Sequence, residues 1–145
     1  CKMFNNSAVQ LVSSKDIAMP KNIVEDMRSK GWSVIDSEKI ESSISHVDIV
    51  YSTRIQEERF TSKDEAGLYR GKFRLNQAIY TAHCEPNTVI MHPLPRDSRE
   101  EANELDIDLD GNPSLAIFRQ TDNGLLVRMA LFAMTLDVVH LVEKN

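Results

Sequence analysis

The stretch AVQLVSSKDIAMPKNIVEDMRSKGWSVI, residues 8–35, establishes the fold that we expect for this chain. It opens on a short, β-branched apolar run at residues 8–13, which is typical of a strand. Residues 20–30 place apolar side chains at helical spacing, with a proline in the first turn and a glycine just past the end. A second apolar run follows at residues 33–35. The stretch therefore predicts two parallel strands joined by a crossover helix.

The same alternation of strand and helix patterns continues along the rest of the chain. The predicted strands are residues 8–13, 33–35, 47–52, 88–91 and 115–118. The predicted helices are residues 20–30, 37–45, 76–83 and 124–142, with Ser37 as a candidate N-cap of the second helix. Polar or proline-containing stretches at residues 53–71 and 92–112 separate the later elements. This order predicts a single doubly wound α/β domain over residues 1–145, with a mainly parallel five-stranded sheet and helices on both faces.

The composition is that of one globular domain of 145 residues. Hydrophobic residues make up 41% of the chain and charged residues 27%, which excludes a disordered or fibrous protein. The net charge is −5 and no block of basic residues occurs, so we expect no nucleic-acid partner. Two cysteines, Cys1 and Cys84, are too few for a disulfide framework and favour a reducing compartment, the cytoplasm. Because the chain opens on Cys1 without the apolar core of a signal peptide, we expect it to be cut from something longer.

The predicted final helix, residues 124–142, is apolar nearly all round. The polar residues that interrupt it are Arg128, Thr135, Asp137 and His140. A helix on the surface of a small domain is normally apolar on one side only. Arg128 and Asp137 would be costly inside a bilayer, so we expect no membrane partner. We instead expect this helix to pack on two sides, against its own sheet and against something that this chain lacks.

Polar residues follow the third predicted strand, at the edge where open parallel sheets bind ligands. Arg54 and Gln56 stand two residues apart, so in an extended chain both side chains point the same way. A planar guanidinium beside an amide suits a carboxylate or a phosphate, and Glu58 is a candidate partner that holds Arg54 in place. The alternative is an ordinary solvated loop of charged residues.

The sequence HPLPR at residues 92–96 follows the fourth predicted strand. Its two prolines fix the backbone and leave a rigid row of carbonyl acceptors, in which one X-Pro bond is a candidate for the cis form. The alternative is a tight surface turn. At residues 118–124, Asp122 or Asn123 is a candidate cap for the final helix, and capping is favoured there over anion binding. The histidines lack metal-ligand spacing, and no glycine loop for a nucleotide occurs.

Three motifs together resemble the aspartate transcarbamoylase family. They are YSTRIQEERF at residues 51–60, MHPLPR at residues 91–96 and FRQTDNG at residues 118–124, in the order and at about the spacing of the family. The ornithine relatives carry Cys-Leu-Pro where this chain has Pro-Leu-Pro. The resemblance covers only the second, aspartate-binding half of the family. It implies that the first half, which binds carbamoyl phosphate, is missing and packs on the apolar final helix.

The resemblance implies a role for several residues of the first motif. Arg54 resembles the arginine that binds the aspartate carboxylate, and Gln56 resembles the glutamine beside it. Glu58 resembles the acid that positions this arginine, and Glu58 and Arg59 lie in the loop that shifts when the two domains close. Glu57 departs from the pattern, because many members have lysine there. This departure places a negative charge near an anionic substrate.

The second motif implies a role in binding the other substrate, carbamoyl phosphate. Leu94 and Pro95 resemble the pair whose backbone carbonyls meet the carbamoyl group, and Pro93 lies in the same row. The implied reaction is attack of the L-aspartate amine on the carbonyl carbon of carbamoyl phosphate, a step of de novo pyrimidine biosynthesis. It needs no metal, no cofactor and no covalent intermediate, and it depends on holding two substrates in line.

The family resemblance implies that the intact enzyme is a trimer. The groups that stabilise the developing charge lie mostly in the missing half, so we expect no catalytic residue in this chain by itself and no activity from it alone. An alternative is a transcarbamoylase-like protein that no longer catalyses and serves as a binding or assembly module. Glu57 is the one sequence feature that favours this alternative.

Overall fold

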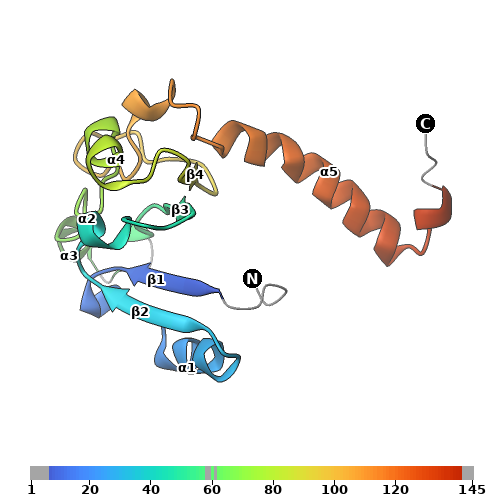
Figure 1. Cartoon of the computed structure of the whole chain (residues 1–145), viewed down its shortest axis with the longest axis horizontal. Helices are drawn as coiled ribbons and strands as arrows, with labels where there is room; N and C mark the ends of the chain where they lie inside the picture. Colours follow the sequence, from blue (N-terminus) through green and yellow to red (C-terminus); the bar gives the residue numbers. More distant parts are fainter. Residues whose placement is uncertain (1–6, 58–59, 61, 142–145) are drawn as a thin grey trace.

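The structure is a computed structural model that describes residues 7–57, 60 and 62–141. Strands β1 (Ala8–Val12) and β2 (Ser33–Ser37) pair in parallel, with Ala8 opposite Ser33. A 3-10 turn, η1 (Lys15–Ile17), and helix α1 (Lys21–Ser29) connect them, and α1 packs against β2 (Figure 1). The predicted unit of two parallel strands and a crossover helix is therefore confirmed.

The ends of α1 agree with the prediction, whereas the start of the next helix does not. Pro20 directly precedes α1, and Gly31, with φ of +83°, follows its C-cap. Strand β2 runs to Ser37, so Ser37 is part of the strand and not an N-cap. Helix α2 (Ile40–Ser43) begins after Lys39, whose backbone N–H donates to the Ser37 hydroxyl at 3.1 Å. The five-residue strand β1 pairs along its full length, and this pairing extends β2 beyond its apolar residues.

The second pair of strands also runs in parallel. Strand β3 (Ile49–Tyr51) pairs with β4 (Val89–Met91), with Ile49 opposite Val89. Helices α3 (Lys63–Gly67) and α4 (Gln77–His83) lie between them in the sequence. The Asn76 side chain caps α4 by accepting the Ile79 N–H at 2.8 Å, so the predicted helix over residues 76–83 is confirmed.

The predicted five-stranded sheet is wrong. The described residues form two separate two-stranded sheets, one of β1 and β2 and one of β3 and β4. The predicted strand at residues 115–118 contributes a single bridge, between Leu115 and Ile90. The chain turns into helix α5 (Ile117–Thr135) two residues later, because the buried Ile117 is anchored in the core as a helical residue.

The final helix is displaced from its predicted range of 124–142. Helix α5 begins at Ile117 and ends at Thr135, and a 3-10 turn, η4 (Val139–Leu141), follows it. Asp122 and Asn123 therefore lie inside the helix and cap nothing. Their side chains are typical of N-caps, but the helix begins at Ile117, five and six residues before them.

The main core lies under β3, β4 and α4. Its buried residues are Ile44, Leu75, Tyr80, Ile90, Leu105, Leu109, Leu115 and Ile117. The Tyr80 hydroxyl donates to the Ser114 hydroxyl at 2.9 Å, and this bond ties α4 to the segment before α5. A 3-10 turn, η3 (Ile107–Leu109), closes the core with Leu109. The core therefore holds β4 and the loop after it in a fixed position.

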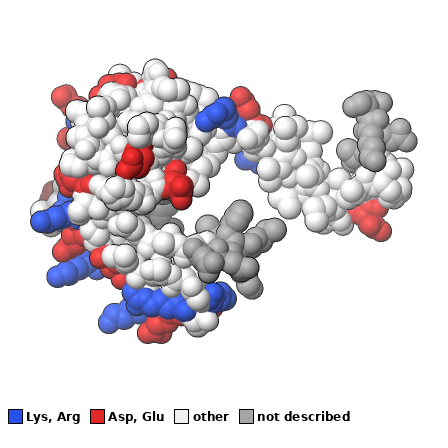
Figure 2. Space-filling view, in the orientation of Figure 1, with Lys and Arg blue, Asp and Glu red and all other residues white. Residues whose placement is uncertain are grey.

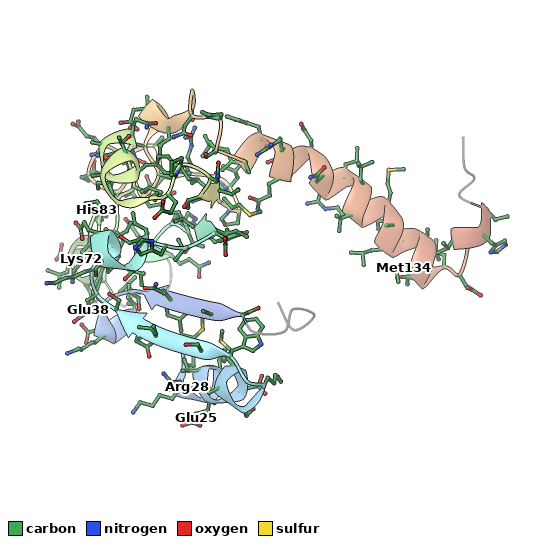
Figure 3. The ribbon with its side chains drawn as sticks, viewed as in Figure 1. Glu25, Arg28, Glu38, Lys72, His83 and Met134 are labelled. Carbon is green, nitrogen blue, oxygen red and sulfur yellow. The ribbon has the colours of Figure 1, made fainter. Side chains whose placement is uncertain are left out.

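Beyond its first turn, α5 extends away from both sheets as an arm (Figure 1). Ile117 and Ala133 are its only buried residues. Its large apolar side chains are exposed, and Figure 2 shows the arm as mostly uncharged, with charged groups near its two ends. Met134, near the far end, lies well away from the rest of the molecule in Figure 3. The expectation that its own sheet covers one side of this helix is therefore wrong beyond the first turn, which packs against β4.

The apolar character of α5 raises the question of a membrane. Within residues 7–57, 60 and 62–141, no helix is both long enough and apolar enough to span one.

Candidate functional site

Two loops leave the same edge of the second sheet, because β3 and β4 are parallel neighbours. Residues 52–57 follow β3, and residues 92–97 follow β4. The Ser52 N–H donates to the Met91 carbonyl at 2.9 Å, so the two chains stay paired one residue beyond the strands. Ligands of open parallel sheets bind at this edge. The structure therefore brings the Thr-Arg-Ile-Gln and His-Pro-Leu-Pro-Arg motifs together.

The positive charge of Arg54, on the first loop, affects the pKa of Asp97, on the second loop. Hydrogen bonds from the Arg99 guanidinium lower the pKa of Asp97 from 3.8 to about 2, and the positive charge of Arg54 contributes to this shift. Arg54 is partly buried, whereas Gln56 is exposed. Both residues thus lie on the loop after β3, with Arg54 close enough to Asp97 to influence its charge.

The loop after β4 has a fixed backbone at Leu94. The Leu94–Pro95 bond is cis, and Leu94 has a φ of +54°. Its N–H donates to His92 Nδ1 at 2.9 Å, and its side chain packs against the core. A non-glycine residue keeps such a φ only where its surroundings hold it there. Pro93 and Pro95 on either side are exposed.

A buried histidine and a buried glutamate support this loop from beneath. His92 and Glu104 are both buried, and His92 Nε2 lies 2.7 Å from Glu104 Oε1. Because Nδ1 accepts the Leu94 N–H, the ring proton is on Nε2, the nitrogen beside the carboxylate. Glu104 also accepts the Asp97 N–H, at 3.2 and 3.3 Å to its two oxygens. The loop is therefore held at Leu94 and at Asp97 by one buried pair.

A second contact joins this loop to β3 and α5. Gln120 of α5 accepts the His92 N–H at 3.2 Å through Oε1. Its side-chain amide donates to the Tyr51 hydroxyl at 3.2 Å. Gln120 belongs to the motif at residues 118–124, so the structure assigns that motif a bridging role in place of helix capping.

Glu57 is the centre of an ion-pair cluster. Its carboxylate accepts two hydrogen bonds from Arg70, at 2.7 and 2.9 Å, and two from Arg99, at 2.7 and 3.3 Å. These hydrogen bonds, from Arg70 first and then Arg99, lower the Glu57 pKa from 4.5 to about 2. Arg99 also donates to Asp97, at 2.5 and 3.0 Å. The negative charge expected to face a substrate is therefore paired with two guanidinium groups.

Several predicted residues lie outside this geometry. Glu58 and Arg59 are outside the described residues, as is the predicted pairing of Glu58 with Arg54. Sequence reasoning, in turn, missed the residues that support the two loops. They are Arg70, His92, Asp97, Arg99 and Glu104. Arg70 and Arg99 lie 13 and 42 residues from Glu57, and no local pattern marks these pairs. His92 lies in the HPLPR motif, but its support of Leu94 was not predicted.

A cavity of about 680 Å³ opens beside the loop after β4. Leu94, Pro95 and Asp97 line it together with the paired side chains of Arg74 and Asp106. Among the residues that the structure describes, no group of three His, Cys, Asp or Glu side chains is placed to hold a metal ion. The site therefore consists of guanidinium groups, carboxylates and fixed backbone carbonyls.

An α/β domain with such groups at the ends of parallel strands is suited to binding an anionic small molecule. Residues 1–135 match the family described as "Aspartate/ornithine carbamoyltransferase, Asp/Orn binding domain", and the chain belongs to this family. The resemblance drawn from the sequence motifs is thereby confirmed.

Relatives and solved structures that resemble this chain include aspartate carbamoyltransferases. The catalytic subunits from Cellvibrio japonicus and Saccharophagus degradans are 67% and 68% identical over 99% and 98% of this chain. The M. jannaschii catalytic subunit has a TM-score of 0.78 at 30% identity, over 99% of this chain and 44% of that one. The Trypanosoma cruzi enzyme in complex with carbamoyl phosphate and aspartate has a TM-score of 0.72 at 31% identity, over 87% and 40%. This chain spans 44% and 42% of the two bacterial relatives.

Proposed function

We propose that residues 1–145 form the aspartate-binding domain of an aspartate carbamoyltransferase, which carbamoylates the L-aspartate amine in de novo pyrimidine biosynthesis. The observation that carries this proposal is the meeting of the Arg54 loop with the Leu94–Pro95 loop at one sheet edge. The family match and the names of the relatives support the same activity. The Pro-Leu-Pro element favours aspartate over ornithine as the substrate.

In this proposal the loop after β3 binds aspartate. The planar Arg54 guanidinium donates to a carboxylate of aspartate, and the Gln56 amide donates beside it. Glu58 orients Arg54, and Arg59 moves with the loop when the domains close. The partial burial of Arg54 supports this role, because hydrogen bonds to a charged ligand are stronger where water is partly excluded.

The loop after β4 binds the carbamoyl group of carbamoyl phosphate. The backbone carbonyls of Leu94 and Pro95 accept hydrogen bonds from the carbamoyl NH₂, and Pro93 keeps the row rigid. The aspartate amine then forms a bond to the carbonyl carbon, and phosphate leaves with the electrons of the broken C–O bond. The proton lost by the amine passes to the departing phosphate, and no metal, cofactor or covalent intermediate takes part. The chain contributes by holding both substrates in line.

The exposed face of α5 is the proposed docking surface for the carbamoyl-phosphate-binding domain. Beyond the first turn of α5, seven large apolar side chains are each more than half exposed: Leu125, Leu126, Val127, Met129, Leu131, Phe132 and Met134. An apolar surface of this kind marks a protein interface. The second domain supplies the groups that stabilise the developing charge, so this chain alone is inactive. The intact enzyme is a homotrimer in the cytoplasm.

Complementation tests this function. The chain is mixed with a separately produced carbamoyl-phosphate-binding domain of a relative, and carbamoyl-aspartate formation is measured. We expect activity from the mixture, none from the chain alone, and none when L-ornithine replaces L-aspartate. A folded chain that forms a complex but no product, with any competent partner domain, would favour a non-catalytic binding or assembly module.

A further inference from the structure

A continuous series of contacts joins Glu57 to the backbone of Leu94. Its first part crosses from the loop after β3 to the loop after β4: Glu57 binds Arg99, and Arg99 binds Asp97. Arg70, from the segment after α3, holds Glu57 from the other side with two hydrogen bonds. Paired hydrogen bonds between a guanidinium and a carboxylate fix orientation as well as distance. This part of the series therefore fixes the two loops relative to each other.

The second part runs from Asp97 into the core. The Asp97 N–H donates to Glu104, Glu104 lies 2.7 Å from His92, and His92 accepts the Leu94 N–H. Side-chain exposure falls along this second part, from 15% at Asp97 to 6% at Glu104 and 1% at His92. Buried polar groups are costly to leave unpaired, so a shift at one end is transmitted instead of being absorbed by water.

We propose that Glu57 is a positioning residue, which holds the Arg54 loop and the Leu94–Pro95 loop at the spacing that the two substrates need. The inference rests on the proposed function, in which each loop binds one substrate. Without the Glu57 carboxylate, Arg99 keeps Asp97 as its acid and Arg70 loses both of its hydrogen bonds to this cluster. The loop after β3 then loses its tie to the loop after β4 at residue 57.

The net charge of the cluster distinguishes a positioning role of Glu57 from a purely electrostatic effect on substrate binding. Arg54, Arg70 and Arg99 with Glu57 and Asp97 carry one net positive charge, and Glu57→Gln raises it to two. If charge alone mattered, the variant would attract the anionic substrate more strongly and lower the KM for aspartate. A positioning role predicts the opposite, because the added charge comes with a misplaced Arg54 loop.

The test compares Glu57→Gln, Glu57→Asp and Glu25→Gln in the chain complemented with the carbamoyl-phosphate-binding domain. We expect Glu57→Gln to raise the KM for aspartate about tenfold and to change kcat by less than about threefold. Glu57→Asp, which keeps the carboxylate, restores most of the affinity. Glu25, exposed on α1 and far from β4 in Figure 3, is the matched control and leaves KM unchanged. A merely destabilised protein would lose active sites and lower kcat at constant KM. That result, or an unchanged or lowered KM, would overturn the proposal.

An NMR comparison does not depend on activity. In the full ¹⁵N-labelled chain, Glu57→Gln is expected to shift the amide signals of Asp97 and Leu94 and the Nε–H signals of Arg70 and Arg99. Glu25→Gln leaves all four in place. An unmoved Leu94 amide would show that the series transmits nothing, and would overturn the proposal even if the KM changes. An inactive wild-type mixture would instead contradict the proposed function, and the substrate-spacing role of Glu57 with it.

Discussion

His92 Nε2 lies 2.7 Å from Glu104 Oε1, with both side chains buried beneath the loop that carries Leu94 and Pro95. The other imidazole nitrogen accepts the Leu94 N–H, and the carboxylate accepts the Asp97 N–H. One buried pair thus fixes two backbone positions of the same loop. The geometry of the carbonyl row therefore depends on two side chains buried beneath it.

Removal of the Glu104 carboxylate is expected to destabilise the domain. Glu104→Ala leaves the Asp97 N–H without its acceptor and removes the carboxylate that lies 2.7 Å from the buried His92 Nε2. We expect the free energy of unfolding to fall by about 2–4 kcal/mol, measured by urea denaturation. Glu100→Ala, at an exposed glutamate of the same segment, is the control and should cost less than about 0.5 kcal/mol. Equal losses for both variants would contradict the supporting role of Glu104.

Acid is expected to weaken the Glu57 cluster at low pH. The pKa values of Glu57 and Asp97 are both lowered to about 2, from 4.5 and 3.8. A carboxyl whose pKa is lower in the folded state stabilises the protein above its unfolded pKa and loses this contribution as the pH falls through the folded value. Wild-type stability should therefore fall between about pH 4.5 and 2.

The contribution of Glu57 to this pH dependence is measurable by difference. Urea denaturation of wild type and Glu57→Gln at a series of pH values gives the two curves. We expect them to lie apart near neutral pH and to converge toward pH 2, because the variant has no carboxyl at this position to protonate. Parallel curves across the whole range would mean that Glu57 is not ion-paired in solution.

The exposed face of α5 is expected to bind the second domain. Phe132 is 67% exposed, and a charge there should prevent its burial against a partner. Phe132→Glu is expected to weaken binding of the carbamoyl-phosphate-binding domain by at least about tenfold in calorimetry, and to reduce binding of a hydrophobic dye by the chain. Leu68→Glu changes an equally exposed apolar residue elsewhere, 74% exposed, and should leave both measurements unchanged. A Phe132→Glu chain that binds the second domain normally would contradict the docking surface.

Local signals explain what could be predicted from the sequence. The unit of β1, α1 and β2 follows from a proline, a glycine and two apolar runs within 30 residues, and Asn76 marks the start of α4. The apolar run at residues 115–118 suits a strand as well as a helix, and only the burial of Ile117 in the tertiary structure selects the helix. Short strands carry too little sequence pattern to reveal that they form two separate sheets.

The candidate site was likewise predictable only where its residues belong to a contiguous motif. Arg54 and the prolines on either side of Leu94 belong to contiguous motifs and were found from them. The partners of Glu57 are Arg70 and Arg99, which lie 13 and 42 residues away. The sequence around neither arginine indicates a contact with Glu57. The sequence predicts only that Glu57 places a negative charge near the substrate, and the folded chain shows its two guanidinium partners.

The most direct test of the whole account is the kinetics of Arg54→Ala in the complemented enzyme. We expect kcat/KM for aspartate to fall at least about a hundredfold, because two hydrogen bonds to a charged carboxylate are lost. Binding of carbamoyl phosphate should stay within about threefold of wild type, and Arg28→Ala, on α1, should leave both unchanged. A complemented Arg54→Ala enzyme that carbamoylates aspartate with wild-type kcat/KM would contradict the assignment of this chain as the aspartate-binding half.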